Sequence, residues 1–160
     1  MDQPSAIKPA NGKLGILMPG MGAVATTVIA GVEAIKAGLG QPIGSLSQMG
    51  TKRLGKRTEG RSPQIKDIVP LAGLDDLVFG GWDVFPDDAY EAATHAGVLE
   101  KDTLNAIEER LRTVKPMKAV FDRDYVRRLE GSHIKSGKDK WAMVLEVRED
   151  IQRFKEDNGV

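Results

Sequence analysis

Short apolar runs alternate along the chain with longer segments in which apolar and polar positions are mixed. Residues 14–18, LGILM, form an apolar run bounded by turn residues, which is typical of a buried strand. Residues 23–37 repeat their apolar positions with a period near 3.6, which predicts a helix with one buried face. The runs at 77–81 and 118–121 predict two more strands, and the run at 43–48, interrupted by a glycine, predicts a weaker one.

Helical patterns fill most of the remaining chain. Pro86 and the two aspartates that follow it suit the first turn of a helix that reaches residue 96. Amphipathic patterns predict further helices at 101–114 and 138–155, and a short helix at 124–129. In the helix at 138–155 we expect four apolar side chains to face a core: Trp141, Leu145, Ile151 and Phe154. Strands that alternate with helices predict an α/β fold with a parallel sheet and flanking helices.

Composition narrows the range of partners. The chain of 160 residues has 23 basic and 23 acidic residues, so it carries no net charge that would attract nucleic acid or an anionic membrane. It contains no cysteine, which excludes disulfides, thiolate catalysis and cysteine-based zinc sites. No apolar run approaches the roughly 18 residues of a membrane span, and the first residues lack the apolar core of a signal peptide. We therefore expect a cytoplasmic protein with neither nucleic acid nor membrane as a partner.

The turn after the first strand has the composition of a dinucleotide-binding turn. Gly20, Gly22 and Ala25 form the pattern Gly-x-Gly-x-x-Ala between a predicted strand and a predicted helix, which is the context that this fingerprint requires. The first glycine permits the tight turn, the second allows close approach of a pyrophosphate, and the alanine keeps the helix near the strand. The pattern indicates a Rossmann-like sheet that binds a dinucleotide. The alternative is a glycine turn that only connects strand to helix.

The acid that usually binds the ribose of NAD is missing from its usual place. It is expected about 20 residues after the turn, but the only acid between Gly20 and Thr58 is Glu33, inside the predicted helix. Asp83, at the end of the strand at 77–81, could bind the ribose instead or could cap the turn before Pro86. The same region carries four basic residues that point either to the 2′-phosphate of NADP or to a solvated loop: Lys52, Arg53, Lys56 and Arg57.

Other catalytic or metal-binding patterns are weak. His95 and His133 are the only histidines, and neither has the spacing of a metal ligand, so we expect no metal site. No nucleophile lies next to a base in the pattern. The basic loop at 50–62 lacks the aromatic residues that usually accompany basic residues in a nucleic-acid site.

Three stretches are more specific than the glycine turn: GMGAVATT at 20–27, IGSLSQMGTKRLGKR at 43–57 and DLVFGGWDVFPDDAYEAATHAGVL at 76–99. With them the chain resembles the myo-inositol-1-phosphate synthases, most closely the bacterial forms, over residues 13–159. The resemblance implies an isomerase that converts glucose 6-phosphate to inositol phosphate by oxidation, aldol ring closure and reduction with the same NAD. It also implies a homo-oligomer, a tetramer when full length. What the segment at 45–57 does is left open.

The resemblance assigns the cofactor site but no catalytic residue. The positions that match cofactor-binding positions of the family are Gly20, Met21, Gly22, Ala23, Val24, Ala25, Asp83, Ala119 and Val120. Some relatives have a turn richer in glycine and asparagine where this chain has Ala23-Val24-Ala25, which leaves backbone contacts to the cofactor here. Because members of the family use NAD, with an acid at the position of Asp83, the resemblance implies NAD rather than NADP.

The family's catalytic lysines and sugar-phosphate site lie in a second region that these residues do not match. We expect residues 1–12 to be a flexible segment and residues 13–160 to be the N-terminal part of an incomplete nucleotide-binding domain, with the catalytic and oligomerisation region absent. Such a fragment is expected to be inactive alone. Two alternatives stay open: another NAD(P)-linked sugar-phosphate oxidoreductase, and a cofactor-binding module without catalysis.

Overall fold

Three parallel strands form the centre of the protein. The computed structural model describes residues 11–160, so most of the flexible segment expected at residues 1–12 lies outside the described residues. Strands β1 (Leu14–Pro19), β2 (Leu77–Asp83) and β3 (Met117–Lys118) pair in the order β1-β2-β3, with Leu14 opposite Leu77 and Trp82 opposite Met117. The parallel α/β class expected from the sequence is therefore confirmed.

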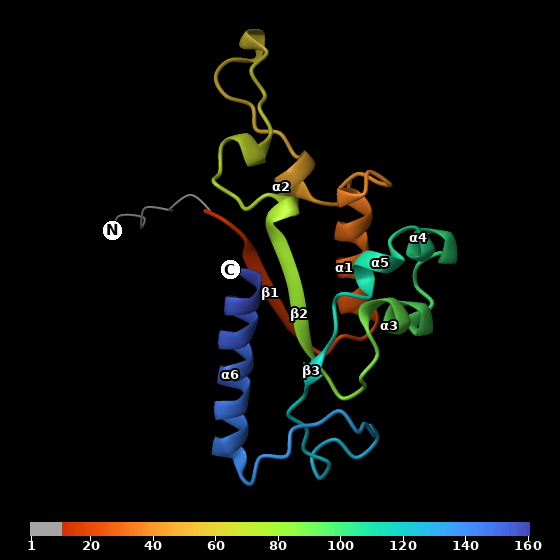
Figure 1. The fold of residues 1–160 in the computed structure, drawn as a ribbon. Helices are drawn as coiled ribbons and strands as arrows, with labels where there is room; N and C mark the ends of the chain where they lie inside the picture. Colours follow the sequence, from red (N-terminus) through yellow and green to blue (C-terminus); the bar gives the residue numbers. More distant parts are fainter. Residues whose placement is uncertain (1–10) are drawn as a thin grey trace.

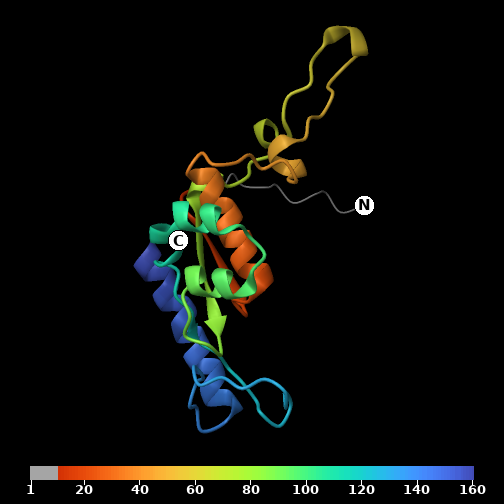
Figure 2. The same cartoon turned by 90° about the vertical axis from the view of Figure 1, so that its right-hand side faces the viewer.

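Helices cover both faces of this sheet, as Figures 1 and 2 show. One face carries four helices: α1 (Ala23–Lys36), α3 (Ala89–Ala96), α4 (Lys101–Ala106) and α5 (Glu108–Leu111). The other face carries α6 (Lys140–Asn158). The result is a three-layer arrangement in which the glycine turn at 20–22 joins the end of β1 to the start of α1.

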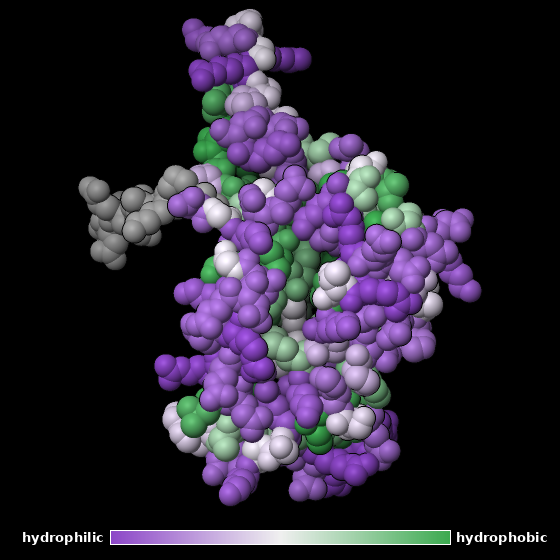
Figure 3. Space-filling model, in the orientation of Figure 1, coloured by the Kyte–Doolittle hydropathy of each residue, from purple (hydrophilic) through white to green (hydrophobic). Residues whose placement is uncertain are grey.

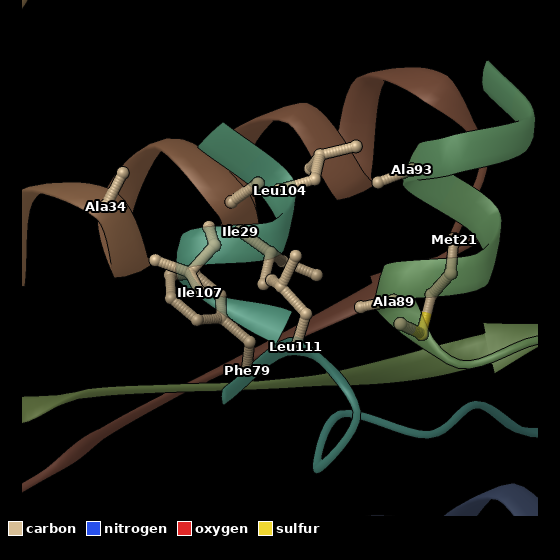
Figure 4. Close-up of a cluster of buried hydrophobic side chains, with 10 residues drawn as sticks. Met21, Ile29, Ala34, Phe79, Ala89, Ala93, Leu104, Ile107 and Leu111 are labelled. Atoms are coloured by element: carbon tan, nitrogen blue, oxygen red, sulfur yellow. The ribbon is translucent and has the colours of Figure 1, made fainter. Parts of the chain in front are cut away.

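The hydrophobic core lies between β2 and the four-helix face. Ile29 of α1, Leu104 of α4 and Leu111 of α5 are almost completely buried around Phe79 of β2, as the close-up in Figure 4 shows. Met21, from the glycine turn, belongs to the same cluster and is 1% exposed. The turn is thus anchored in the core by a large side chain, and its position depends on how that core packs.

Two glycines explain how α6 packs on its face of the sheet. A Cβ atom on Gly80 would lie 2.6 Å from the ring of Phe154, and one on Gly15 would lie 2.9 Å from it. The ring therefore occupies the space that side chains on β1 and β2 would need. The expectation that Phe154 faces the sheet holds, but the other three side chains expected with it, Trp141, Leu145 and Ile151, are exposed. The helix contacts the rest of the protein through a narrower stripe than its apolar pattern predicts.

Several predicted elements differ from the structure. No strand forms at 43–48, where the chain makes a turn and then the short helix α2 (Leu46–Met49). The helix expected at 101–114 breaks at Ile107, whose φ of −121° and ψ of 14° leave the helical region. Residues 124–129 form turns, and β3 is shorter than the strand expected at 118–121.

The chain between α1 and β2 leaves the body of the protein as an arm, residues 39–76. It contains α2, an antiparallel bridge between Thr51 and Gln64, and three single turns of 3₁₀ helix: η1 (Arg57–Glu59), η2 (Ile65–Asp67) and η3 (Leu74–Asp76). In Figure 1 the arm extends from the end of the sheet opposite the glycine turn, and Figure 3 shows mainly hydrophilic side chains at its tip. The segment at 43–48, expected to be a strand, is therefore part of this arm.

None of the helices in the part of the chain that the structure describes is long and apolar enough to cross a membrane.

We predict that Gly80→Ala destabilises the protein by about 1–3 kcal/mol, because the new methyl group must displace the Phe154 ring from the sheet. Chemical denaturation monitored by circular dichroism measures this change. Gly31→Ala in α1 is the matched control, since its Cβ meets no atom within 4 Å; this change should raise stability by about 0.5–1 kcal/mol. Equal stability of the Gly80 variant and the unmodified protein would contradict the packing described.

Candidate functional site

An open cleft of about 1040 Å³ lies where the carboxyl ends of β1 and β2 meet the start of α1. Ligands of parallel α/β sheets bind at this end of the strands. Seven of the nine residues that the sequence predicts for the cofactor line the cleft: Gly20, Met21, Gly22, Ala23, Asp83, Ala119 and Val120. The structure therefore brings together residues from three segments that are far apart in the sequence.

The other two predicted residues, Val24 and Ala25, do not line the cleft. The Val24 side chain is 81% exposed, whereas Ala25 is buried. A small residue at position 25 is what the dinucleotide fingerprint requires, because α1 there lies close to the strand that precedes it. What these two residues contribute to the site is their backbone, at the first turn of α1.

The glycine turn has the backbone geometry of a ligand-binding turn. Gly20 has a φ of +91°, a conformation that favours glycine, and its N–H donates to the carbonyl of Trp82 over 2.8 Å. A Cβ atom added to Gly20 or to Gly22 would meet no other atom within 4 Å. The space in front of both glycines is therefore open toward the cleft, as close approach of a phosphate would need.

The first turn of α1 presents unsatisfied donors at the same place. Gly22 is the N-cap residue, no side chain caps the helix, and its first turn contains no acid. The first helical bond at this end runs from the Thr26 N–H to the Gly22 carbonyl over 3.0 Å. The N–H groups of Ala23, Val24 and Ala25 precede that bond, so together with the helix dipole they favour an anion in the cleft.

Asp83 ties the glycine turn to the end of β2. One carboxylate oxygen accepts the Met21 N–H over 2.6 Å, and the other accepts the Phe85 N–H over 3.0 Å. The second bond caps the turn that follows β2, so the structural alternative that the sequence left open is present. The hydrogen bond from the Met21 N–H to Asp83 was not among the predictions from the sequence. Each oxygen keeps a further lone pair, so Asp83 can also accept from a ligand in the cleft.

Met21 and Gly81 fit together behind the turn. Gly81 pairs with Met18, and a Cβ atom at Gly81 would collide with the Met18 carbonyl oxygen and approach the Met21 side chain to 3.1 Å. The second glycine of the Gly-Gly-Trp-Asp segment thus leaves room for Met21. Local pattern identified this segment, but the reason for its glycines depends on neighbours that only the fold provides.

Other cleft residues were not among the sequence predictions for the site. Trp82 and Phe85 come from β2 and the turn after it, and His95 comes from α3. His95 is largely exposed, and its Nδ1 lies 3.1 Å from a carboxylate oxygen of Asp87. Trp82 directly precedes Asp83 at the end of a predicted strand. This position was the sequence feature that could have indicated that Trp82 lines the cleft.

The helix that carries His95 is fixed at its start by the N-cap Asp88. One oxygen of this buried carboxylate accepts the N–H groups of Tyr90 and Glu91, and the other pairs with Arg112 over 3.2 Å. The pKa of Arg112 is raised, first by its hydrogen bond to Glu108 and further by the charge of Asp88. The expected helix forms, but it begins at Ala89, so Pro86 and Asp87 precede its first turn and Asp88 caps it. The cap sets the position of one side of the cleft.

The basic residues of the arm do not belong to this site. Lys52, Arg53, Lys56 and Arg57 are all exposed, and none of them is among the described residues that line the cleft. The arm leaves the opposite end of the sheet (Figure 1). The hypothesis that they hold a 2′-phosphate beside the glycine turn is therefore wrong for this structure, because the expected strand at 43–48, which would have led them there, does not form.

Comparisons with known proteins agree with this geometry. The sequence model for the NAD-binding domain of myo-inositol-1-phosphate synthase matches residues 14–160. Inositol-3-phosphate synthase 1 from Bacteroides thetaiotaomicron is 50% identical, over 96% of this chain and 35% of its own length. Inositol-3-phosphate synthase from Saccharomyces cerevisiae is 30% identical, over 92% of this chain and 32% of its own. The chain thus spans about a third of the length of these curated relatives.

A solved structure supports the fold. The crystal structure of inositol-3-phosphate synthase from Caenorhabditis elegans matches with a TM-score of 0.81 and 23% identity, over 95% of this chain and 33% of that one. The described residues also fit a dinucleotide on their own terms. They combine open space at Gly20 and Gly22, free donors at the start of α1 and a carboxylate in an otherwise largely apolar cleft.

We predict that Gly22→Ala lowers the affinity for NAD by about tenfold or more, because the methyl group takes the space needed for close approach of the pyrophosphate. The free energy of unfolding should fall by less than about 1 kcal/mol, since φ at this N-cap is negative and suits alanine. Calorimetric titration and denaturation separate the two effects. Gly40→Ala, whose Cβ also meets open space but lies in the arm, should leave NAD affinity unchanged. Unchanged affinity in the Gly22 variant would contradict the site.

Proposed function

Because the chain belongs to the myo-inositol-1-phosphate synthase family, we propose that it is the NAD-binding part of an enzyme that isomerises D-glucose 6-phosphate to 1D-myo-inositol 3-phosphate. The observation that carries the proposal is the glycine turn, which presents open space and free N–H donors to a large apolar cleft. We infer that residues 13–160 are the N-terminal part of a longer nucleotide-binding fold. Alone, this part is inactive.

Different residues of the cleft bind different parts of the cofactor. The backbone at Gly20, Gly22 and the first turn of α1 holds the pyrophosphate, because these groups offer donors and no competing side chain. Asp83 accepts a hydrogen bond from a ribose hydroxyl while it keeps the Met21 N–H. Ala119 and Val120 line the cleft with apolar side chains, which would cover a ring of the bound cofactor and exclude water from it.

The chemical step needs catalytic groups other than the cleft residues described above. Bound NAD supplies reversible hydride transfer, so that a sugar alcohol is oxidised and later restored without net consumption of the cofactor. The residues of this chain bind and orient the dinucleotide and exclude water. The intramolecular aldol step needs a general base and a group that stabilises an oxyanion, and we assign neither role to the chain.

The wider context follows from the same proposal. The complete protein takes glucose 6-phosphate as its substrate, supplies inositol for phospholipid synthesis in the cytoplasm and assembles as a homo-oligomer, a tetramer. Neutral overall charge supports the absence of nucleic acid and membrane partners. The competing function, another NAD(P)-linked sugar-phosphate oxidoreductase, loses its main support because the basic residues of the arm lie away from the cleft.

We predict that the chain prefers NAD to NADP by about tenfold or more, because the Asp83 carboxylate repels a 2′-phosphate and would lose its hydrogen bond to a ribose hydroxyl. Asp83→Ala should reduce this preference and weaken NAD binding. It should also lower stability by about 1–3 kcal/mol, since two backbone N–H groups lose their acceptor. Calorimetric titration with each cofactor and thermal unfolding measure these effects. Tighter binding of NADP by the unmodified chain would refute the assignment of Asp83.

A chimera tests the proposed activity. Residues 14–160 replace the matching third of the Bacteroides relative, and the purified chimera receives glucose 6-phosphate and NAD. We expect inositol phosphate to form while absorbance at 340 nm stays constant, because NADH does not accumulate. The control is the same chimera carrying Gly22→Ala, which should lose activity. A folded chimera that binds NAD but yields no inositol phosphate, or that accumulates NADH, would contradict the proposal.

A further inference from the structure

Asp150 is a buried carboxylate on α6 whose three partners come from different parts of the fold. Its side chain is 9% exposed. One oxygen accepts the indole N–H of Trp82 over 2.8 Å and pairs with the ammonium group of Lys135, and the other pairs with Arg153 over 2.9 Å. Lys135 is equally enclosed, with 6% of its side chain exposed. The cluster therefore joins β2, the segment at 133–135 and α6.

Two of these partners, Trp82 and Lys135, connect Asp150 to the residues that line the cleft. Trp82 is the last residue of β2 before Asp83 and lines the cleft itself. Lys135 donates its backbone N–H to the Ala119 carbonyl over 2.9 Å, and the Ala119 N–H donates to the His133 carbonyl over 3.0 Å. Ala119 also lines the cleft. Asp150 does not line the cleft itself but contacts Trp82, which does, and Lys135, which is bonded to Ala119.

The chemistry of the cluster indicates that it fixes the orientation of the side chains around Asp150. Burying an ion pair has a desolvation cost that its attraction offsets only when the geometry is good and the remaining lone pairs are used. Asp150 satisfies this condition with three donors, of which the indole N–H has a fixed direction. A tryptophan ring otherwise has freedom about two side-chain bonds. The hydrogen bond to Asp150 fixes the direction of the indole ring, and so the shape of the cleft where Trp82 lines it.

We propose that Asp150 is a positioning residue for the cofactor cleft, acting through the Trp82 indole and through Lys135 on the Ala119 wall. This inference rests on the NAD site proposed above. Val147 of α6 itself lines the cleft, and the inference gives the same helix a second role in binding. The role is indirect, since Asp150 orients the groups that contact the ligand.

The first experiment is a double-mutant cycle on NAD affinity, measured by calorimetric titration of the chain. Asp150→Ala and Trp82→Phe should each weaken binding, by about tenfold, and in the Trp82→Phe background Asp150→Ala should cost clearly less than tenfold, because only the route through Lys135 remains. Glu149→Ala, the neighbouring exposed carboxylate on α6, is the matched control and should bind as the unmodified chain does. Fully additive losses, or no loss in Asp150→Ala, would overturn the proposal.

The second experiment needs no cofactor. The chain has two tryptophans, and Trp141 is 69% exposed, so Trp141→Phe leaves Trp82 as the only reporter. In that background Asp150→Ala should reduce the near-ultraviolet dichroism of Trp82 and increase its quenching by acrylamide, while far-ultraviolet dichroism stays the same. Asp150→Asn keeps an oxygen that accepts from the indole, so it should restore much of the Trp82 signal. Unchanged Trp82 spectra in Asp150→Ala would refute the positioning role.

The two experiments separate two kinds of failure. If the unmodified chain does not bind NAD, the proposed function fails, and the Trp82 spectra still decide whether Asp150 fixes the indole. If NAD binds and the spectra of Asp150→Ala match those of the Trp141→Phe parent, the positioning role fails while the proposed function stands.

Discussion

The hydrogen bond from the Met21 N–H to Asp83 joins two segments that lie 62 residues apart, and the cleft depends on it. The bond holds the glycine turn against the end of β2, and the Gly20 N–H adds a second link to the Trp82 carbonyl. Beneath the turn, the Met21 side chain lies in the core. The start of α1 is thereby fixed from both sides, so its free donors point to one place and need little reorganisation when an anion binds.

The glycines of the Gly-Gly-Trp-Asp segment show how one strand serves both faces of the sheet. Gly80 leaves room for Phe154 from α6, and Gly81 leaves room for Met21 from the turn. The next two residues then supply one wall and one acid to the cleft. Alternation of side chains along a strand makes this division possible, because neighbouring residues face opposite sides. The segment therefore couples packing on the α6 face to the position of the ligand site.

The local sequence pattern was sufficient to predict those elements that depend only on residues near one another in the sequence. The strand at 77–81, the helix after Gly22 and its open first turn follow from apolar period and glycine placement. The pattern failed at 43–48, where a turn and a short helix form in place of the expected strand, and at Ile107, a buried core residue whose backbone leaves the helical region although the apolar period continues. The bond from Met21 to Asp83 and the cluster at Asp150 depend on residues more than 60 positions apart, so no local pattern contains them.

The most direct test of the central claim is a titration of the ¹⁵N-labelled chain with NAD, followed by backbone amide resonances. The account predicts that the amides of Gly22, Ala23 and Val24 shift first and most, because they offer the free donors at the start of α1. The amides of Lys52 and Arg57 in the arm should not move. Shifts confined to the arm, or none at the glycine turn at saturating NAD, would contradict the claim that this turn holds the dinucleotide.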